Sequence, residues 1–167
     1  MKRSDPFARE ESIEMRVIVD SNLLARATYS ESGPAAEVVR KLTGQPHVLI
    51  VSPFLLSELR RVLGYPRLQR LHGFDQHQID RVVTALAALA TSVEPHEQRD
   101  ARDVPDDPDD DHIIAAAVVG SVDVICTRNK HLYHEAVIAY CKERTSEVVD
   151  DVSLLRRLRE NEAGTTA

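Results

Sequence analysis

The chain has 167 residues, of which 43% are hydrophobic and 29% charged, a mixture typical of one folded globular domain. This composition excludes a disordered protein, and the longest apolar runs, such as 85–90, are too short to cross a bilayer. The two cysteines, Cys126 and Cys141, form neither a disulfide framework nor a zinc-ligand pattern. Since residues 1–14 also lack the apolar segment of a secretory signal, we expect a cytoplasmic protein that does not bind membranes.

The formal net charge of −6 argues against a protein that coats nucleic acid through overall basicity. The charges are nevertheless segregated along the chain. Acidic residues crowd into one stretch (Asp106, Asp107, Asp109, Asp110 and Asp111), and arginines into another (Arg60, Arg61, Arg67 and Arg70). This separation suits a metal site beside a phosphate-binding surface, and it equally suits two ordinary solvated faces.

The pattern predicts a polar tail over 1–14, a single domain over 15–160 and a second polar tail over 161–167. Short β-branched runs predict buried strands at 16–20, 47–51 and 123–127, with weaker candidates at 91–94 and 147–149. Apolar residues at helical spacing predict five helices, which begin at Pro, Ser or Asp and in part end at Gly. They span 34–42, 53–63, 75–90, 107–120 and 151–159. Because strands and helices alternate, we expect an α/β fold with a parallel sheet covered on both faces.

Asp20 directly follows the first predicted strand. Sites in open parallel sheets form at the carboxyl ends of the strands. A carboxylate that is desolvated there needs a partner, and a bound cation is one good answer. Capping of the turn or helix that follows is the alternative.

Glu58 and Asp111 occupy comparable places on two predicted helices. Glu58 shares the edge of an apolar stripe with Leu55 and Val62, which directs it toward the core or a cleft; pairing with Arg61 is the alternative. Asp111 precedes a stripe that begins at Ile114, so its helix should turn it inward. Asp107, Asp109 and Asp110 are explained by capping and by the helix dipole.

Three inward-facing acids on separate elements suit a hard cation such as Mg²⁺ or Mn²⁺. Such an ion acidifies a bound water and neutralises charge on a scissile phosphate. The seven histidines are scattered along the sequence, and they assemble no Ser/His/Asp triad. A phosphohydrolase that uses Asp20 as a nucleophile is a further alternative, although Asn22 breaks the Asp-x-Asp pattern of such enzymes.

Four segments in order resemble a PIN domain, specifically the toxin-like, VapC-related group. They are 17–22 (VIVDSN), 52–59 (SPFLLSEL), 107–117 (DPDDDHIIAAA) and 123–132 (DVICTRNKHL). The resemblance spans about 15–150 and implies a three-layer α/β/α sandwich with a central, mainly parallel sheet. It also implies metal-dependent hydrolysis of RNA phosphodiesters and, for toxin members, a cognate antitoxin and frequent homodimers.

Carried over to this chain, the resemblance makes Asp20, Glu58 and Asp111 the acidic ligands of Mg²⁺ or Mn²⁺ and the catalytic residues. Asn22 and Thr127 match residues that support the site. Asn129 stands where many relatives have an aspartate, so the site could bind either one metal ion or two. Asp107 or Asp110 could also contribute to it.

We therefore expect a metal-dependent endoribonuclease, the toxin of a toxin–antitoxin pair. The alternative is a catalytically weak module that binds RNA or a protein partner, which Asn129 favours. Candidates for gripping the RNA backbone are basic residues near the acids, namely Arg60, Arg61, Arg67, Arg128 and Lys130.

Overall fold

A computed structural model of the chain describes residues 13–95 and 111–165. The centre of this described part is a sheet of five strands, all parallel, in the order β3-β2-β1-β4-β5. The strands are β1 (Arg16–Val19), β2 (Val48–Val51), β3 (Thr91–Ser92), β4 (Val124–Cys126) and β5 (Glu147–Val149). The expected α/β/α architecture around a parallel sheet is confirmed.

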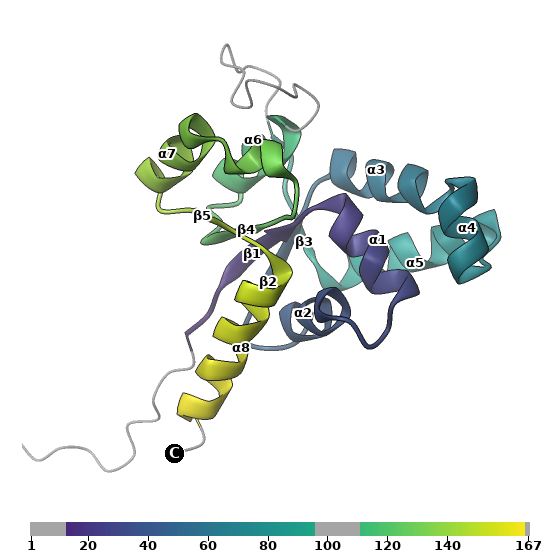
Figure 1. The fold of residues 1–167 in the computed structure, drawn as a ribbon, viewed down its shortest axis with the longest axis horizontal. Coiled ribbons are helices and arrows are strands. Elements are labelled where there is room, and N and C mark those ends of the chain that lie inside the picture. The colour runs from purple at the N-terminus through teal and green to yellow at the C-terminus, as the bar shows by residue number, and fades with distance from the viewer. Residues whose placement is uncertain (1–12, 96–110, 166–167) are drawn as a thin grey trace, which may run out of the picture.

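Helices cover both faces of the sheet, as Figure 1 shows. They are α1 (Ser21–Tyr29), α2 (Pro34–Leu42), α3 (Pro53–Leu63), α4 (Pro66–His72), α5 (Gln76–Leu89), α6 (Asp111–Val119), the short 3₁₀ helix η2 (Lys130–Tyr133), α7 (Glu135–Glu143) and α8 (Asp151–Thr165). In this view α6 and α7 lie above the sheet, α2 and α8 below it, and α1 to its right. Within the described ranges, no helix combines the length and the apolar character needed to cross a bilayer.

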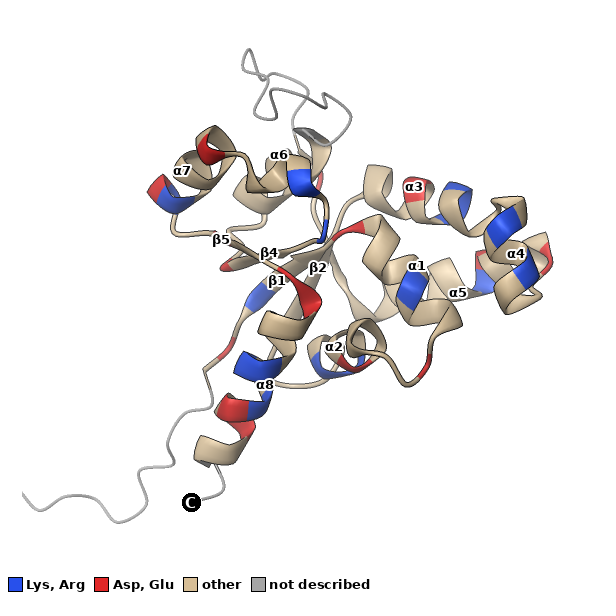
Figure 2. Ribbon diagram, viewed as in Figure 1, with Lys and Arg blue, Asp and Glu red and all other residues tan. Residues whose placement is uncertain are grey.

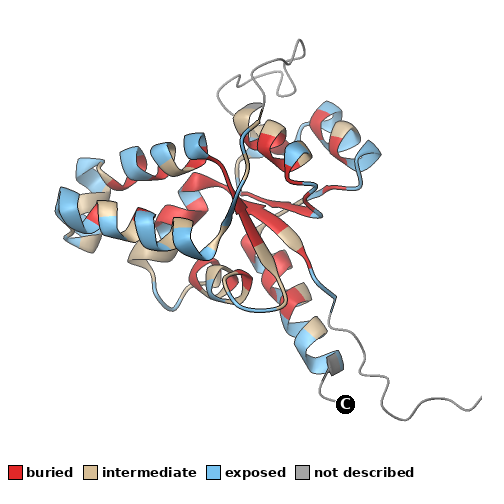
Figure 3. Cartoon of the chain, turned by 180° about the vertical axis from the view of Figure 1, so that it is seen from behind, coloured by how far each residue is buried: buried red, intermediate tan, exposed pale blue. Residues whose placement is uncertain are grey.

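The central strands β1 and β2 are buried beyond their first residues (Figure 3). Val17, Ile18 and Val19 of β1 are at most 1% exposed, which explains why this strand reads as a continuous apolar run rather than an alternating one. Since both faces of the sheet are filled with apolar side chains, polar chemistry is confined to the strand ends and the loops that follow them.

Three helices were not anticipated from the sequence, namely α1, α4 and α7. Pro66, which follows the predicted helix over 53–63, is the first residue of α4, a position where a missing N–H costs nothing. The final helix also continues beyond Arg159 to Thr165. An ion pair ties this extension to α2, where Glu162 meets Lys41 at 2.7 Å, and Arg159 just before it meets Glu37 at 2.6 Å.

Candidate active site

Asp20 lies where β1 passes into α1, at the carboxyl end of the sheet's central strand. Its side chain caps α1, because Oδ1 accepts a hydrogen bond of 2.8 Å from the backbone N–H of Asn22. The other oxygen, Oδ2, accepts a 2.7 Å hydrogen bond from the Thr127 hydroxyl, which comes from the end of β4. Both oxygens are therefore fixed by neighbours, and the carboxyl group has a single well-defined orientation.

The electrostatic surroundings of Asp20 leave its charge poorly compensated. The residue is only 7% exposed, and burial raises the pKa of its carboxyl, opposed by the bonds from Thr127 and Asn22. The negative charge of Glu58 raises this pKa further. Among the described residues, no Lys, Arg or His nitrogen lies within ion-pair distance of Asp20. A bound cation would supply the compensation that the chain does not.

Glu58, on the second turn of α3, lies close enough to Asp20 for its charge to act on that carboxyl. Its side chain is 18% exposed, and its carboxylate lies 3.3 Å from Nε2 of His112 and 3.5 Å from the Arg61 guanidinium. The hydrogen bond from His112, with a further one from Ser21, lowers the pKa of Glu58 below its usual range. Glu58 is therefore an ionised carboxylate beside Asp20, and its expected pairing with Arg61 is also present.

The third expected acid, Asp111, is the first residue of α6. The next residue, His112, contacts Glu58 of α3, so the backbone of Asp111 lies near Glu58. The side chain of Asp111 and the whole of Asp107 and Asp110 lie outside the described residues. Among the side chains that are described, no three His, Cys, Asp or Glu residues form a group that could hold a metal ion.

Thr127 and Asn129 organise the loop after β4. Thr127 is fully buried; its hydroxyl oxygen accepts the backbone N–H of Asn129 at 3.0 Å, and its carbonyl accepts the Tyr133 hydroxyl at 2.7 Å. The Asn129 side chain caps η2 by accepting the backbone N–H of His131 at 3.1 Å. The sequence predicts a supporting role for both residues; in the structure Thr127 bonds to Asp20 and Asn129 caps η2.

A pocket of about 430 Å³ opens beside Asp20. It is lined by residues of α1 and of the segment after β4, namely Asp20, Asn22, Leu23, Arg26, Arg128, Asn129 and His131. Two guanidinium-bearing residues thus share a depression with the buried carboxylate. Figure 2 shows the basic segment after β4 lying close to the acidic start of α8, where Arg128 pairs with the buried Asp151 through bonds of 2.5 and 3.1 Å.

This arrangement of acids at the carboxyl edge of a parallel sheet coincides with a family match. A family model described as a PIN domain matches residues 16–131. The chain belongs to the PIN-domain family. In the same comparisons, no curated protein and no solved structure matches the chain.

PIN domains are generally nuclease domains, and they typically use divalent metal ions. The residues of this PIN domain fit such an ion by two observations. Asp20 is a buried carboxylate without a cationic partner among the described residues, and Glu58 beside it is held ionised. Carboxylate oxygens are the donors that Mg²⁺ and Mn²⁺ prefer.

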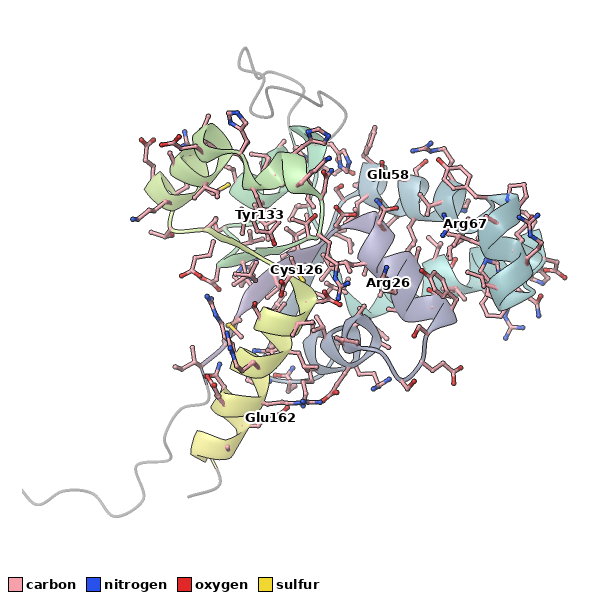
Figure 4. All side chains as sticks on the ribbon, in the orientation of Figure 1. Arg26, Glu58, Arg67, Cys126, Tyr133 and Glu162 are labelled. Carbon is pink, nitrogen blue, oxygen red and sulfur yellow. The ribbon has the colours of Figure 1, made fainter. Side chains whose placement is uncertain are left out.

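The basic residues expected to bind RNA are dispersed over this PIN domain. Arg128 lines the pocket, and Arg61 lies beside Glu58 and donates to the Tyr65 hydroxyl at 2.6 Å. Arg60 instead pairs with Asp80 of α5 at 2.7 Å. Lys130 begins η2, whereas Arg67 lies on α4, at the far end of the helical layer from the strand edge (Figure 4).

Two residues near the acids escaped the sequence reasoning, Arg26 and His112. Arg26 follows Asn22 by four residues, so both lie on one face of α1; recognising that helix would have brought Arg26 to the site. His112 was grouped with the scattered histidines, although its place directly after Asp111 was a usable signal.

Proposed function

We propose that this PIN domain is a metal-dependent endoribonuclease that hydrolyses RNA phosphodiester bonds. The observation that carries the proposal is the buried, immobilised carboxylate of Asp20 next to the ionised Glu58. Two anionic groups this close repel each other unless a cation is shared between them. Asp20 lines a pocket at the carboxyl end of the sheet, which leaves room for a substrate.

Asp20 and Glu58, with Asp111 from the start of α6, are the proposed ligands of Mg²⁺ or Mn²⁺ and the catalytic residues. A divalent ion bound there supplies an acidified water and charge neutralisation at a phosphate. Thr127 holds Asp20 in its orientation through the 2.7 Å hydrogen bond. Asn22 holds the other oxygen through its backbone N–H.

The pocket beside Asp20 is the proposed binding site for the RNA backbone. Arg26 and Arg128 both line it, and guanidinium groups bind phosphate through paired N–H donors. Lys130 and Arg61 extend the basic surface on either side. Aromatic residues are only 4% of the chain, so phosphate contacts rather than base stacking should dominate the affinity.

We further propose that the chain is the toxin of a toxin–antitoxin pair, with a cognate antitoxin as its protein partner. Support comes from the four segments that resemble VapC-related proteins. A homodimer fits the exposure of Leu71 and Leu89, at 60% and 61%. Growth arrest on induced expression in bacteria, lost in Asp20→Asn, would support the toxin role; unimpaired growth with active protein would contradict it.

A second candidate function is a catalytically weak module that binds RNA or a protein. Asn129 is the observation that favours it, because an amide stands where many relatives carry an acid. Its side-chain oxygen is also engaged in capping η2. An amide contributes no negative charge, so a second ion would be bound less strongly there.

Cleavage of a mixed RNA pool by the purified full chain tests the main proposal. We expect products with Mn²⁺ or Mg²⁺, none with EDTA, and none from Asp20→Asn or Glu58→Gln under any condition. Asp80→Asn and Glu143→Gln are matched controls, since they make the same chemical changes at exposed positions of α5 and α7, and both should cleave normally.

Binding of Mn²⁺ separates the two candidate functions. A chain that neither cleaves RNA nor shows a Mn²⁺-dependent rise in melting temperature would support the binding module and contradict the nuclease. Cleavage that persists in EDTA, or in Asp20→Asn, would contradict the proposed site.

A further inference from the structure

His112 lies against the same face of α3 that carries Glu58. Its Nε2 is 3.3 Å from Oε2 of Glu58, and only 14% of its side chain is exposed. Phe54, four residues before Glu58 and therefore on the same helical face, packs its ring on the imidazole with a centroid distance of 4.2 Å and an interplanar angle of 39°. The imidazole is thus fixed on one side by a ring and at one nitrogen by a carboxylate.

The two nitrogens of His112 have different surroundings. Nε2 faces a carboxylate oxygen, which can only accept when ionised. Nδ1 is buried and has no hydrogen-bond partner among the residues that the structure describes. A hydrogen on Nδ1 would be a buried donor without an acceptor there, which costs more than an unmatched lone pair. The geometry therefore places the hydrogen that is donated to Glu58 on Nε2.

Glu58 has two further partners besides His112, a hydrogen bond from the buried Ser21 and the guanidinium of Arg61. Arg61 approaches Oε1 only to 3.5 Å, and its side chain is 63% exposed, so solvent screens this pair. His112 holds Oε2 from a largely buried position, so this oxygen of the carboxylate is anchored.

We propose that His112 is a positioning residue, which donates its Nε2–H to Glu58 and orients that carboxylate for the ion; the proposal rests on the function proposed above. Histidine and carboxylate partners that orient metal ligands change metal affinity by about 10- to 100-fold when they are removed. Phe54 packs against one face of the ring and so restricts how far the imidazole can tilt away from Glu58.

Amide variants distinguish the two nitrogens of His112. The side-chain nitrogen of Gln reaches the place of Nε2, whereas that of Asn reaches the place of Nδ1. We expect His112→Gln to keep Mn²⁺ affinity within about 3-fold of wild type in calorimetric titrations, and His112→Asn and His112→Ala to lose about 10-fold or more. Equal affinities in all three variants would overturn the proposal.

Two measurements on the metal-free chain in EDTA test the contact between His112 and Glu58 independently of RNA cleavage and metal binding. The ¹⁵N shifts of histidine-labelled protein at about pH 8 should show the Nε2–H form of His112. In thermal melts, the combined variant His112→Ala with Glu58→Gln should lose less than the sum of the two single losses. An Nδ1–H ring, or fully additive losses, would overturn the proposal even in an active nuclease.

The failures of the two proposals are distinguishable. Suppose that the wild-type chain binds no Mn²⁺ and cleaves no RNA, but shows the Nε2–H ring and the non-additive losses. This result would overturn the proposed function and the role of His112 in metal binding. The hydrogen bond between His112 and Glu58 would then be purely structural. Active, metal-binding protein with the wrong ring form would overturn the role of His112 alone.

Discussion

The hydroxyl of Thr127 donates a 2.7 Å hydrogen bond to Oδ2 of Asp20, across 107 residues of sequence. The bond joins the ends of β1 and β4, neighbours in the sheet. Thr127 in turn accepts the backbone N–H of Asn129. A single hydroxyl therefore couples the orientation of the buried acid to the loop that lines the adjoining pocket.

Thr127→Val should destabilise the protein and weaken metal binding. The change removes a buried bond to a carboxylate and leaves the Asn129 N–H without its acceptor, a loss of about 2 kcal/mol, or about 4–8 °C in melting temperature. Thr127→Ser keeps the hydroxyl and should therefore retain most of the stability and most of the metal affinity. Differential scanning calorimetry in EDTA and titration with Mn²⁺ are the measurements.

The loss in Thr127→Val should also depend on pH. The Thr127 bond lowers the pKa of Asp20, so removing it raises that pKa further in the folded state. The stability that a protonated Asp20 contributes is fully present below its unfolded pKa, about 3.9, and is lost as the pH rises through the folded value. The difference from wild type should therefore be smaller at pH 4 than at pH 7; a constant difference would contradict this account.

Asp20→Asn should make the metal-free protein more stable at neutral pH. The pKa of Asp20 is raised in the folded state, mainly by burial, which means that ionisation costs stability at every pH above that value. A neutral amide of the same shape removes the cost and can still accept from Asn22. A gain of about 1 kcal/mol would raise the melting temperature by about 2–4 °C.

The same variant should lose its response to metal. Melts in EDTA and in Mn²⁺ should coincide for Asp20→Asn, whereas wild type should gain stability with the ion. Asp80→Asn, at an exposed pair on α5, is the control, and its melting temperature should change little. A destabilised Asp20→Asn in EDTA would show that the carboxylate serves the fold rather than a ligand.

Much of this fold follows from local sequence patterns. The β-branched runs before Asp20 and Thr127 predicted two buried strands, and the structure places them as parallel neighbours with their ends together. Helix α1 was missed because Asp20 and Ser21 join a strand to a helix with no intervening loop, so no turn residues announce it. Helix α4 was missed because its first residue is Pro66, and proline both stops one helix and starts the next.

The contacts within the site were less accessible to sequence reasoning. Asp20 and Glu58 could be selected because each breaks an apolar pattern from a position that should be buried. The bond from His112 to Glu58, and the stacking of Phe54 on that ring, depend on how α6 packs against α3. Side-chain spacing within one helix carries no information about such a contact.

Arg26→Ala should weaken RNA binding and leave stability unchanged. Arg26 is exposed on α1 and lines the pocket beside Asp20, so its removal should cost about 2- to 5-fold in affinity and reduce the slope of log affinity against log salt by about 0.7. Anisotropy titrations of a single-stranded oligonucleotide in EDTA measure both quantities. Arg67→Ala, on α4, is the matched control; an equal loss there would place the RNA elsewhere.

Arg128→Ala should lower both stability and RNA binding, unlike Arg26→Ala. Asp151 is buried, with 1% of its side chain exposed, and Arg128 is its ion-pair partner. Removing the guanidinium leaves that carboxylate without its partner, which costs 3–5 kcal/mol in fully buried pairs. Because Arg128 itself is 43% exposed, solvent screening reduces the expected loss to about 1–3 kcal/mol.

Arg128→Lys separates the two roles of this arginine. A lysine keeps the charge that faces phosphate but loses the two parallel bonds to Asp151. It should therefore recover most of the RNA affinity and only part of the stability, as measured by anisotropy and by thermal melts on the same preparations. Full recovery of stability would show that charge alone, and not the paired geometry, holds α8 against the loop after β4. An RNA affinity as low as that of Arg128→Ala would instead show that phosphate is bound through the planar guanidinium.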